Sequence, residues 1–337
     1  MAFAVTSSHF RYELRYGDVV SRRHRRARVG ADAPDLRTSV GSVELRNPVM
    51  TASGTAGHAD ELGRYVDLSA LGAVVVKSLA ATAWPGNPPP RVHETPAGML
   101  NSVGLQGGGV EHWLESELPR LIEAGATVVA SIWGTDPEGY AKAAATLASA
   151  APSVVAVEVN VSCPNHHAGG KMFAHSPSLT AEAVEASTAC GRPVWCKLSP
   201  NVADLPEIAA AAWEAGAAAV TLINTVPGLV IDLESRQPLL ARGKGGGLSG
   251  PAIHPIAVRA VYDVHAALPE LPIVGVGGVA KGEDAVELLL AGASAVQVGT
   301  ATFVNPRAVL AVLQGLEDWC TRHGVCEVRE LIGGAHG

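Results

Sequence analysis

Eight short apolar runs recur along the chain, and helical stretches separate most of them. The stretches 204–216 and 281–292 are typical, because apolar residues recur at helical spacing and a glycine follows the last of them. Runs without polar alternation are expected for strands buried on both faces, as in parallel sheets covered by helices. The runs span residues 48–51, 73–77, 127–131, 153–159, 193–197, 219–223, 272–276 and 295–298.

Eight strands that alternate with helices predict an α/β fold of the (β/α)8 barrel type. The alternative is a doubly wound sheet, which is expected to begin with a glycine-rich turn after its first strand. Residues 52–57, Ala-Ser-Gly-Thr-Ala-Gly, follow the first run and lack that fingerprint. The barrel is therefore the preferred prediction.

Three segments interrupt the alternation and define the predicted domain organisation. Residues 38–46 are predicted to form a hairpin that closes the bottom of the barrel. Residues 84–109 and 225–250 are rich in glycine and are expected as insertions at the C-terminal face, where barrel enzymes carry out their chemistry. The prediction is a poorly ordered N-terminal extension at residues 1–37 and one barrel domain at residues 38–337.

Composition excludes several classes of function. Among 337 residues, 25 basic and 32 acidic side chains leave a net charge of −7, which argues against nucleic acid as the main partner. The basic cluster at residues 21–28 is predicted to be a solvated arm. The five cysteines are odd in number and lack disulfide or Cys-x-x-Cys spacing, so a reduced, cytoplasmic chain without a metal site is expected. No apolar run approaches the length of about 18 residues that suggests a membrane span.

Polar residues occur where successive predicted strands end. They are Lys77 and Ser78, Ser131, Asn160, Lys197, and Asn224 with Thr225. In a barrel these positions surround the active site. Two lysines without an acid in this group predict a bound anion or an electron-rich ring, such as a reduced flavin.

Glycines follow the last two predicted strands. Gly277 and Gly278 end the seventh, and Gly299 with Thr300 ends the eighth. Loops after these strands are the usual phosphate site of the barrel architecture. A ligand that carries a phosphate and also fills the barrel mouth is therefore expected, and FMN meets both demands.

The segment Val-Asn-Val-Ser-Cys-Pro-Asn at residues 159–165 follows the fourth run. Asparagine side chains both donate and accept hydrogen bonds, which suits a planar heterocycle with alternating C=O and N–H groups. The thiol of Cys163 is a candidate base or nucleophile. An isolated cysteine is more often buried and inert, so this interpretation depends on the surrounding residues.

Several of these segments resemble class 1 dihydroorotate dehydrogenases, from about residue 40 to about residue 310. They are Asn-Val-Ser-Cys-Pro-Asn at 160–165 followed by Gly169 and Gly170, Asn-Ser-Val-Gly-Leu-Gln at 101–106, Ile-Asn-Thr at 223–225, and Gly-Leu-Ser-Gly-Pro-Ala-Ile at 247–253. The chain looks most like class 1B, the NAD-linked form. The resemblance implies oxidation of (S)-dihydroorotate to orotate in pyrimidine synthesis, with FMN taking a hydride from C6 and Cys163 removing the C5 proton.

The resemblance also implies roles for individual residues. Catalysis is assigned to Cys163, Lys197 and Lys77. FMN binding is assigned to Ser53, Lys77, Ser78, Ser131, Asn160, Lys197, Ile223, Gly250, Gly277, Gly278, Gly299 and Thr300. Substrate binding is assigned to Lys77, Asn101, Ser102, Val103, Gly104, Leu105, Asn160, Asn224 and Thr225. The chain departs from the family at Ser131, where asparagine is usual, at the bulky Trp133, and at His166 with His167.

Class 1B enzymes pair with a second subunit that carries FAD and an iron–sulfur cluster, so the resemblance implies such a partner as well as a homodimer. Two other functions stay open at this point. One is a related flavin dehydrogenase that acts on another dihydropyrimidine-like substrate in a specialised pathway. The other is a non-catalytic barrel that binds a phosphate-bearing ligand.

Overall fold

The computed structural model describes residues 33–162, 172–240 and 245–337. These residues belong to one compact unit that begins at Ala33. The backbone N–H of Asp35 already donates to the carbonyl oxygen of Cys326 (2.8 Å), so the chain joins this unit ahead of residue 38. Residues 1–32, within the predicted N-terminal extension, lie outside the described part.

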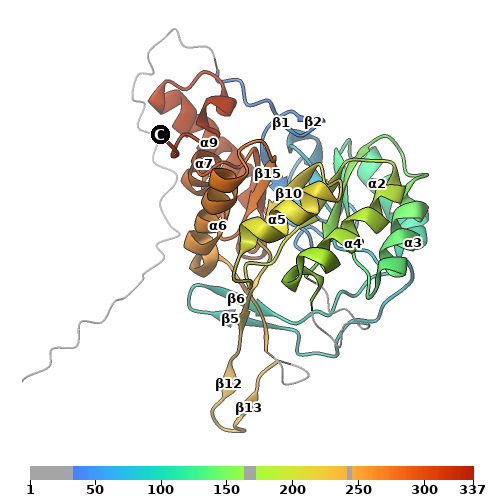
Figure 1. Cartoon of the computed structure of the whole chain (residues 1–337). Helices are drawn as coiled ribbons and strands as arrows, with labels where there is room; N and C mark the ends of the chain where they lie inside the picture. Colours follow the sequence, from blue (N-terminus) through green and yellow to red (C-terminus); the bar gives the residue numbers. More distant parts are fainter. Residues whose placement is uncertain (1–32, 163–171, 241–244) are drawn as a thin grey trace, which may run out of the picture. The chain divides into compact units, whose positions relative to one another are not determined.

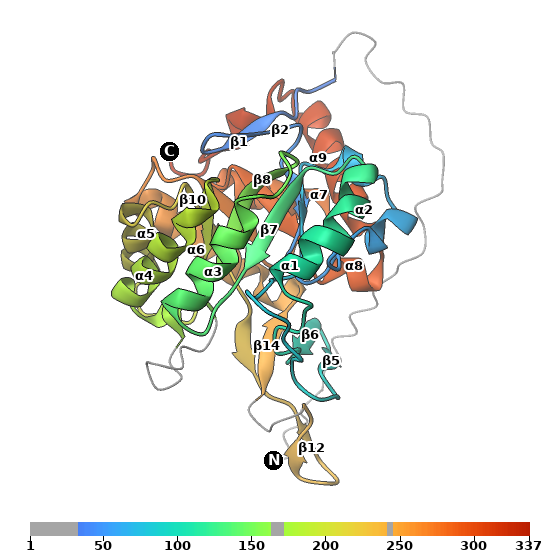
Figure 2. The ribbon, with the colours of Figure 1, turned by 90° about the vertical axis from the view of Figure 1, so that its right-hand side faces the viewer.

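The core of the unit is a barrel of eight parallel strands surrounded by helices (Figures 1 and 2). All eight predicted runs form these strands, so the (β/α)8 prediction is confirmed. The strands are β3 (Val49–Thr51), β4 (Val74–Val75), β7 (Val128–Ile132), β8 (Val154–Asn160), β9 (Val194–Lys197), β10 (Ala219–Leu222), β15 (Ile273–Val276) and β16 (Ala295–Val298). Their order around the sheet is β3-β16-β15-β10-β9-β8-β7-β4.

The sheet closes between β3 and β4, which rules out the doubly wound alternative. A parallel bridge joins Met50 to Ala73 across this seam. The hydroxyl of Thr51 donates to the carbonyl oxygen of Val75 (3.3 Å) and accepts from its N–H (2.9 Å). Closure therefore leaves no exposed edge in this sheet.

Helices cover the outside of the barrel, and N-capping residues in the sequence define where several of them begin. Asp136 accepts from the N–H of Gly139 (2.7 Å), and Asp204 accepts from the N–H of Glu207 (3.0 Å), each followed by a proline in the first turn. The predicted stretches 204–216 and 281–292 are confirmed as α5 and α7. The α-helices are α1 (Val110–His112), α2 (Leu118–Glu123), α3 (Pro137–Leu147), α4 (Pro177–Ser187), α5 (Leu205–Glu214), α6 (His254–Ala267), α7 (Gly282–Leu290), α8 (Ala301–Val304) and α9 (Ala308–His323).

Shorter helical turns complete the connections. A π-helical stretch, Trp113–Glu117, joins α1 to α2. The 3-10 helices are Glu61–Arg64, Leu68–Ala70, Phe173–His175, Thr188–Cys190, Pro251–Ile253 and Val328–Leu331. Across residues 33–162, 172–240 and 245–337, no helix has the length and apolar composition that crossing a bilayer requires.

The predicted hairpin closes the N-terminal end of the barrel. Strands β1 (Thr38–Val40) and β2 (Val43–Leu45) pair antiparallel. Their buried side chains pack against an inner apolar layer that includes Met50, Val129 and Trp195. Because side chains in a strand alternate, the next inward-facing residues lie two positions further along. On β8, β9 and β16 these are Glu158, Lys197 and Gln297, so polar groups lie directly above the apolar layer.

The two predicted insertions meet at the C-terminal face and form one sheet. The first supplies β5 (Val92–Thr95) and β6 (Gly98–Asn101), and the second supplies β11 (Val226–Gly228) and β14 (Gly246–Ser249). Their order is β11-β14-β6-β5, with Asn101 paired with Gly247. A further hairpin, β12 (Ile231–Asp232) with β13 (Gln237–Pro238), extends away from the barrel in Figures 1 and 2.

Arg192 fastens the end of α3 to the start of β8. Its Nε donates to the carbonyl oxygen of Val154 (2.8 Å), and its Nη1 donates to those of Leu147 (2.9 Å) and Cys190 (3.3 Å). We expect Arg192→Met to lower the free energy of unfolding by about 3 kcal/mol, because part-buried carbonyl groups lose a charged donor. Urea denaturation followed by circular dichroism measures this change.

Arg259→Met is the matched control for Arg192→Met. Arg259 forms an exposed ion pair with Asp263 one turn along α6, and such pairs contribute little to stability. Equal losses of stability in the two variants would contradict the fastening role of Arg192.

Candidate functional site

A cavity of about 460 Å³ opens at the C-terminal face, between the barrel mouth and the four-stranded sheet. It brings together residues from the ends of seven of the eight barrel strands, all but β7, and from both insertions. The predicted residues that line it are Ser53, Lys77, Ser78, Asn101, Val103, Leu105, Asn160, Lys197, Ile223, Asn224, Thr225, Gly250, Gly277, Gly278, Gly299 and Thr300. Segments far apart in the sequence thus converge on one site.

Four predicted residues are placed differently or lie outside the described part. Ser131 is fully buried and does not line the cavity, because its hydroxyl lies behind Ser78 at 2.9 Å. Ser102 and Gly104 also do not line it. The hydroxyl of Ser102 accepts from the side-chain amide of Asn87 (3.1 Å), and a Cβ on Gly104 would lie 2.6 Å from the same side chain. Cys163 lies outside the described residues.

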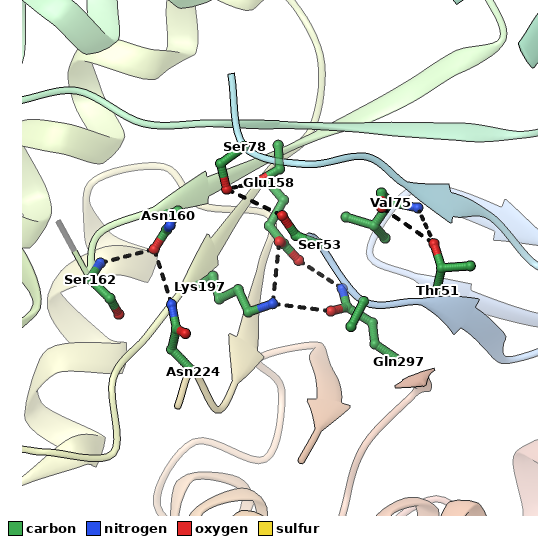
Figure 3. A network of polar contacts seen from close by, with 12 residues as sticks. Thr51, Ser53, Val75, Ser78, Glu158, Asn160, Ser162, Lys197, Asn224 and Gln297 are labelled. Carbon is green, nitrogen blue, oxygen red and sulfur yellow. Dashed lines mark hydrogen bonds and ion pairs between the residues drawn. The ribbon is translucent and has the colours of Figure 1, made fainter. Parts of the chain in front are cut away.

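Two asparagines in the cavity hold each other in fixed orientations (Figure 3). The side-chain oxygen of Asn160 accepts from the Asn224 amide (3.1 Å) and from the backbone N–H of Ser162 (3.1 Å). The side-chain oxygen of Asn224 accepts from the N–H of Thr225 (2.8 Å). Because these bonds specify which end of each amide is oxygen, the site presents a defined donor and acceptor pattern.

Lys197 extends from β9 toward the cavity and is held from below by two side chains (Figure 3). Its Nζ lies 3.6 Å from Oε1 of Glu158 and 3.3 Å from Oε1 of Gln297. The amide of Gln297 donates to the other oxygen of Glu158 (2.7 Å). The three residues form a closed triangle in the polar layer of the barrel interior.

Lys77 reaches the same cavity from the end of β4. Gly54 has a φ of +87°, and a Cβ there would lie 3.3 Å from Cδ of Lys77. A side chain at position 54 would therefore crowd the lysine stem. The site thus contains the ammonium groups of both Lys77 and Lys197.

Glycine-containing turns after β15 and β16 form another wall of the cavity, called the glycine wall below. Gly277 and Gly278 follow β15, and Gly299 follows β16. His254 fixes the first turn, because one ring nitrogen lies 2.8 Å from the Gly277 carbonyl oxygen and the other lies 3.1 Å from the Glu287 carboxylate. The hydroxyl of Thr300 donates to that of Ser249 on β14 (2.7 Å), which links this wall to the four-stranded sheet.

Some lining residues were not predicted from the sequence. Ser199 and Asn201 follow β9, and the Asn201 amide donates to the Ser199 hydroxyl (2.8 Å) and to the carbonyl oxygen of Thr225 (3.2 Å). Ser249 and Phe303 also line the cavity. Asn201 and Ser249 are polar, like the residues predicted to line the site, but neither directly follows a barrel strand. The search for polar residues at strand ends therefore missed both.

Comparisons with known proteins agree with this architecture. Residues 35–319 match the family described as dihydroorotate dehydrogenase. The catalytic subunit of dihydroorotate dehydrogenase B (NAD(+)) from Pelobacter propionicus is 47% identical over 301 residues, covering 89% of this chain and 98% of that protein. The protein of the same description from Desulforudis audaxviator is 49% identical over 299 residues, covering 88% and 96%. A third, from Trichlorobacter lovleyi, is 46% identical over 305 residues, covering 90% and 99%. The chain belongs to the dihydroorotate dehydrogenase family.

Proposed function

We propose that this chain oxidises (S)-dihydroorotate to orotate in pyrimidine synthesis, with FMN as its cofactor. Membership of the family implies an enzyme that uses a flavin. The single observation that carries the proposal is the convergence of Lys77, Lys197, Asn160 and Asn224 with the glycine wall in one cavity.

The residues present suit FMN. A cavity of about 460 Å³ falls within the range of small-molecule and cofactor sites. The Gly277–Gly278 and Gly299–Thr300 turns would hold a phosphate through backbone N–H groups and the threonine hydroxyl. The ammonium group of Lys197 would lie against the ring system and favour negative charge on it.

The chain's own residues divide the chemistry between binding, charge stabilisation and proton removal. Bound FMN would supply a hydride acceptor. The fixed amides of Asn160 and Asn224 would bind the imide edge of the dihydropyrimidine and hold its ring in one orientation. Lys77 would neutralise substrate charge, and Cys163, the base that the resemblance assigns, would take the C5 proton.

Anaerobic mixing tests the proposed function. The protein is loaded with FMN and mixed with dihydroorotate in a stopped-flow instrument, and bleaching of the visible flavin band is followed. We expect full bleaching by dihydroorotate and a spectral change when orotate is added to the oxidised protein. The proposal fails if the bound flavin is reduced by dithionite but stays oxidised with saturating dihydroorotate.

We also propose a partner subunit and a cytoplasmic location. The relatives' names describe them as catalytic subunits, which supports a second subunit here. The partner proposed is an FAD and iron–sulfur protein that passes electrons to NAD, alongside a homodimer of this chain. Cys190, Cys196, Cys320 and Cys326 are free thiols, consistent with a reducing compartment. Co-purification from the native host tests the partner subunit, and the mass of the recovered complex tests the homodimer. Fractionation of the same cells, with this chain followed in the cytoplasmic fraction, tests the location.

We expect Gly278→Ala to weaken FMN binding by about 100-fold or more. Gly278 has a φ of +70°, and a Cβ there would lie 2.6 Å from Cβ of His254 and 2.9 Å from the carbonyl oxygen of Gly250. Relieving that overlap would displace the turn assigned to the phosphate. Quenching of FMN fluorescence on titration with flavin-free protein measures the affinity.

Gly139→Ala is the control for Gly278→Ala. Gly139 lies in α3, where a Cβ would meet its nearest atom at an ordinary 3.4 Å. Unchanged FMN affinity is expected in this variant. If Gly278→Ala also binds FMN with wild-type affinity, this turn is not the phosphate site.

A further inference from the structure

We propose that Glu158 and Gln297 are positioning residues that pair with the ammonium group of Lys197 and hold it directed into the cavity. The inference rests on the proposed function, since it concerns the lysine placed against the flavin. Neither residue lines the cavity, and each would act only through Lys197. The family resemblance gave neither of them a role.

The carboxylate of Glu158 is the ion-pair partner of Lys197. Glu158 is 0% exposed and lies within the apolar strand β8, where an ionised group needs a partner. Its Oε1 accepts no hydrogen bond in the described part of the chain and faces Lys197 Nζ at 3.6 Å. The lysine side chain is itself only 7% exposed. Each charge therefore compensates the other in a site with little access to water.

Gln297 supplies the orientation. Its amide nitrogen donates to Glu158 Oε2 (2.7 Å), since a carboxylate only accepts. The opposite end of the amide must then be oxygen, and this oxygen lies 3.3 Å from Lys197 Nζ. The amide thus fixes both charged groups at once, as Figure 3 shows.

The arrangement has a chemical consequence for the cavity. An ammonium group has three N–H donors, and two acceptors, on Glu158 and Gln297, lie within the barrel interior. The triangle therefore leaves donor capacity for a ligand in the cavity. Without the carboxylate, the buried ammonium group loses its ion-pair partner and is no longer held in this position beside the cavity.

Glu158→Gln tests the role of the carboxylate, because the glutamine side chain has nearly the same shape but carries no charge. We expect the midpoint potential of bound flavin to become more negative and its reduction by dihydroorotate to slow by about 100-fold. In a Lys197→Met background the same substitution is expected to produce no further fall in potential. Thr221→Val is the matched control, because it removes a buried hydroxyl from neighbouring β10 that has no described hydrogen-bond partner. This control should keep the wild-type potential.

A charge swap separates positioning from packing. Combining Glu158→Gln with Gln297→Glu returns a carboxylate to within reach of Lys197, at the position now 3.3 Å from Nζ. We expect the swap to restore the potential and to bring the reduction rate within about 10-fold of wild type. Gln297→Met, which removes only the bridging amide, should lower the reduction rate by about 10-fold. In a Lys197→Met background, Gln297→Met should produce no further change in that rate.

Melting of the flavin-free protein gives a readout that needs neither flavin nor substrate. Glu158→Gln should melt at a lower temperature than wild type, and the charge swap should recover most of the loss. A potential that rises or stays unchanged in Glu158→Gln would overturn the proposal, as would a swap that fails to rescue. If the melting and potential results hold but dihydroorotate reduces no flavin, the proposed function fails and the positioning role stands.

Discussion

Cys163→Ala is expected to abolish dihydroorotate oxidation while FMN stays bound. Alanine provides no group that can take the C5 proton, and loss of a general base typically costs 10²–10⁴-fold in rate. The rate constant for flavin bleaching should therefore fall by about 1,000-fold. Flavin affinity should remain near the wild-type value, because the proposed FMN contacts come from other residues. Stopped-flow bleaching and fluorescence titration measure the two quantities on the same preparation.

Cys326→Ala is the natural control for the loss of a thiol. Cys326 is the one exposed cysteine in the described part of the chain, and it lines no part of the cavity. Cys190, Cys196 and Cys320 are buried, and burial raises the pKa of each thiol. Raised pKa values keep these three groups protonated at neutral pH, so none of them can replace Cys163 as the base.

The pH profile tests the thiol directly. A base must be deprotonated to act, and a free thiol has a pKa of about 8.5. The bleaching rate of the wild type should therefore rise with pH through the pKa of Cys163 and then level off. The bleaching rate of Cys163→Ala should not show this rise with pH. A variant that still reduces its flavin at the wild-type rate, with the same pH dependence, would exclude Cys163 as the base.

Much of the barrel was predictable because its signals are local. A fully buried parallel strand appears as a short apolar run, and all eight runs became strands. The C-terminal ends of parallel strands meet at one face, so the polar residues that follow them had to converge. Lys77, Asn160, Lys197 and Asn224 do line one cavity.

Pairing between the two insertions was not predictable. The partners β6 and β14 join Asn101 to Gly247, residues that four of the eight barrel strands separate in the sequence. Neither segment shows strong apolar alternation, and Gly246 and Gly247 begin the second strand. The register depends on close backbone approach, since a Cβ on Gly246 would clash with the Asn101 carbonyl oxygen.

Residues behind the cavity wall were also missed, although the sequence held a signal for them. Glu158 and Gln297 interrupt apolar runs and were included in those runs as strand residues. A charged residue in a strand buried on both faces needs a buried partner, which was the available clue. Ser131 is the opposite case, a residue predicted to line the site that does not reach the cavity. Its position at a strand end did not show that Ser78 lies between its hydroxyl and the cavity.

Lys197→Met is expected to slow flavin reduction by about 100- to 1,000-fold, the cost typical of removing one group that stabilises developing charge. The substitution also leaves Glu158 buried without its ion-pair partner. Breaking a buried pair in this way costs about 3–5 kcal/mol of stability. Stopped-flow bleaching and urea denaturation should therefore both report losses. Lys142→Met, on the exposed side of α3, should change neither measurement.

Adding Glu158→Gln to Lys197→Met separates the two losses. The double variant carries no buried charge, and replacing both members of a buried pair is often neutral for stability. Its urea midpoint should return toward the wild-type value. Its flavin reduction should stay slow, because the ammonium group of Lys197 is absent from the cavity. If instead the rate recovers with the stability, Lys197 acts by supporting the fold, and the charge on the flavin must be stabilised by another group, with Lys77 the remaining lysine in the cavity.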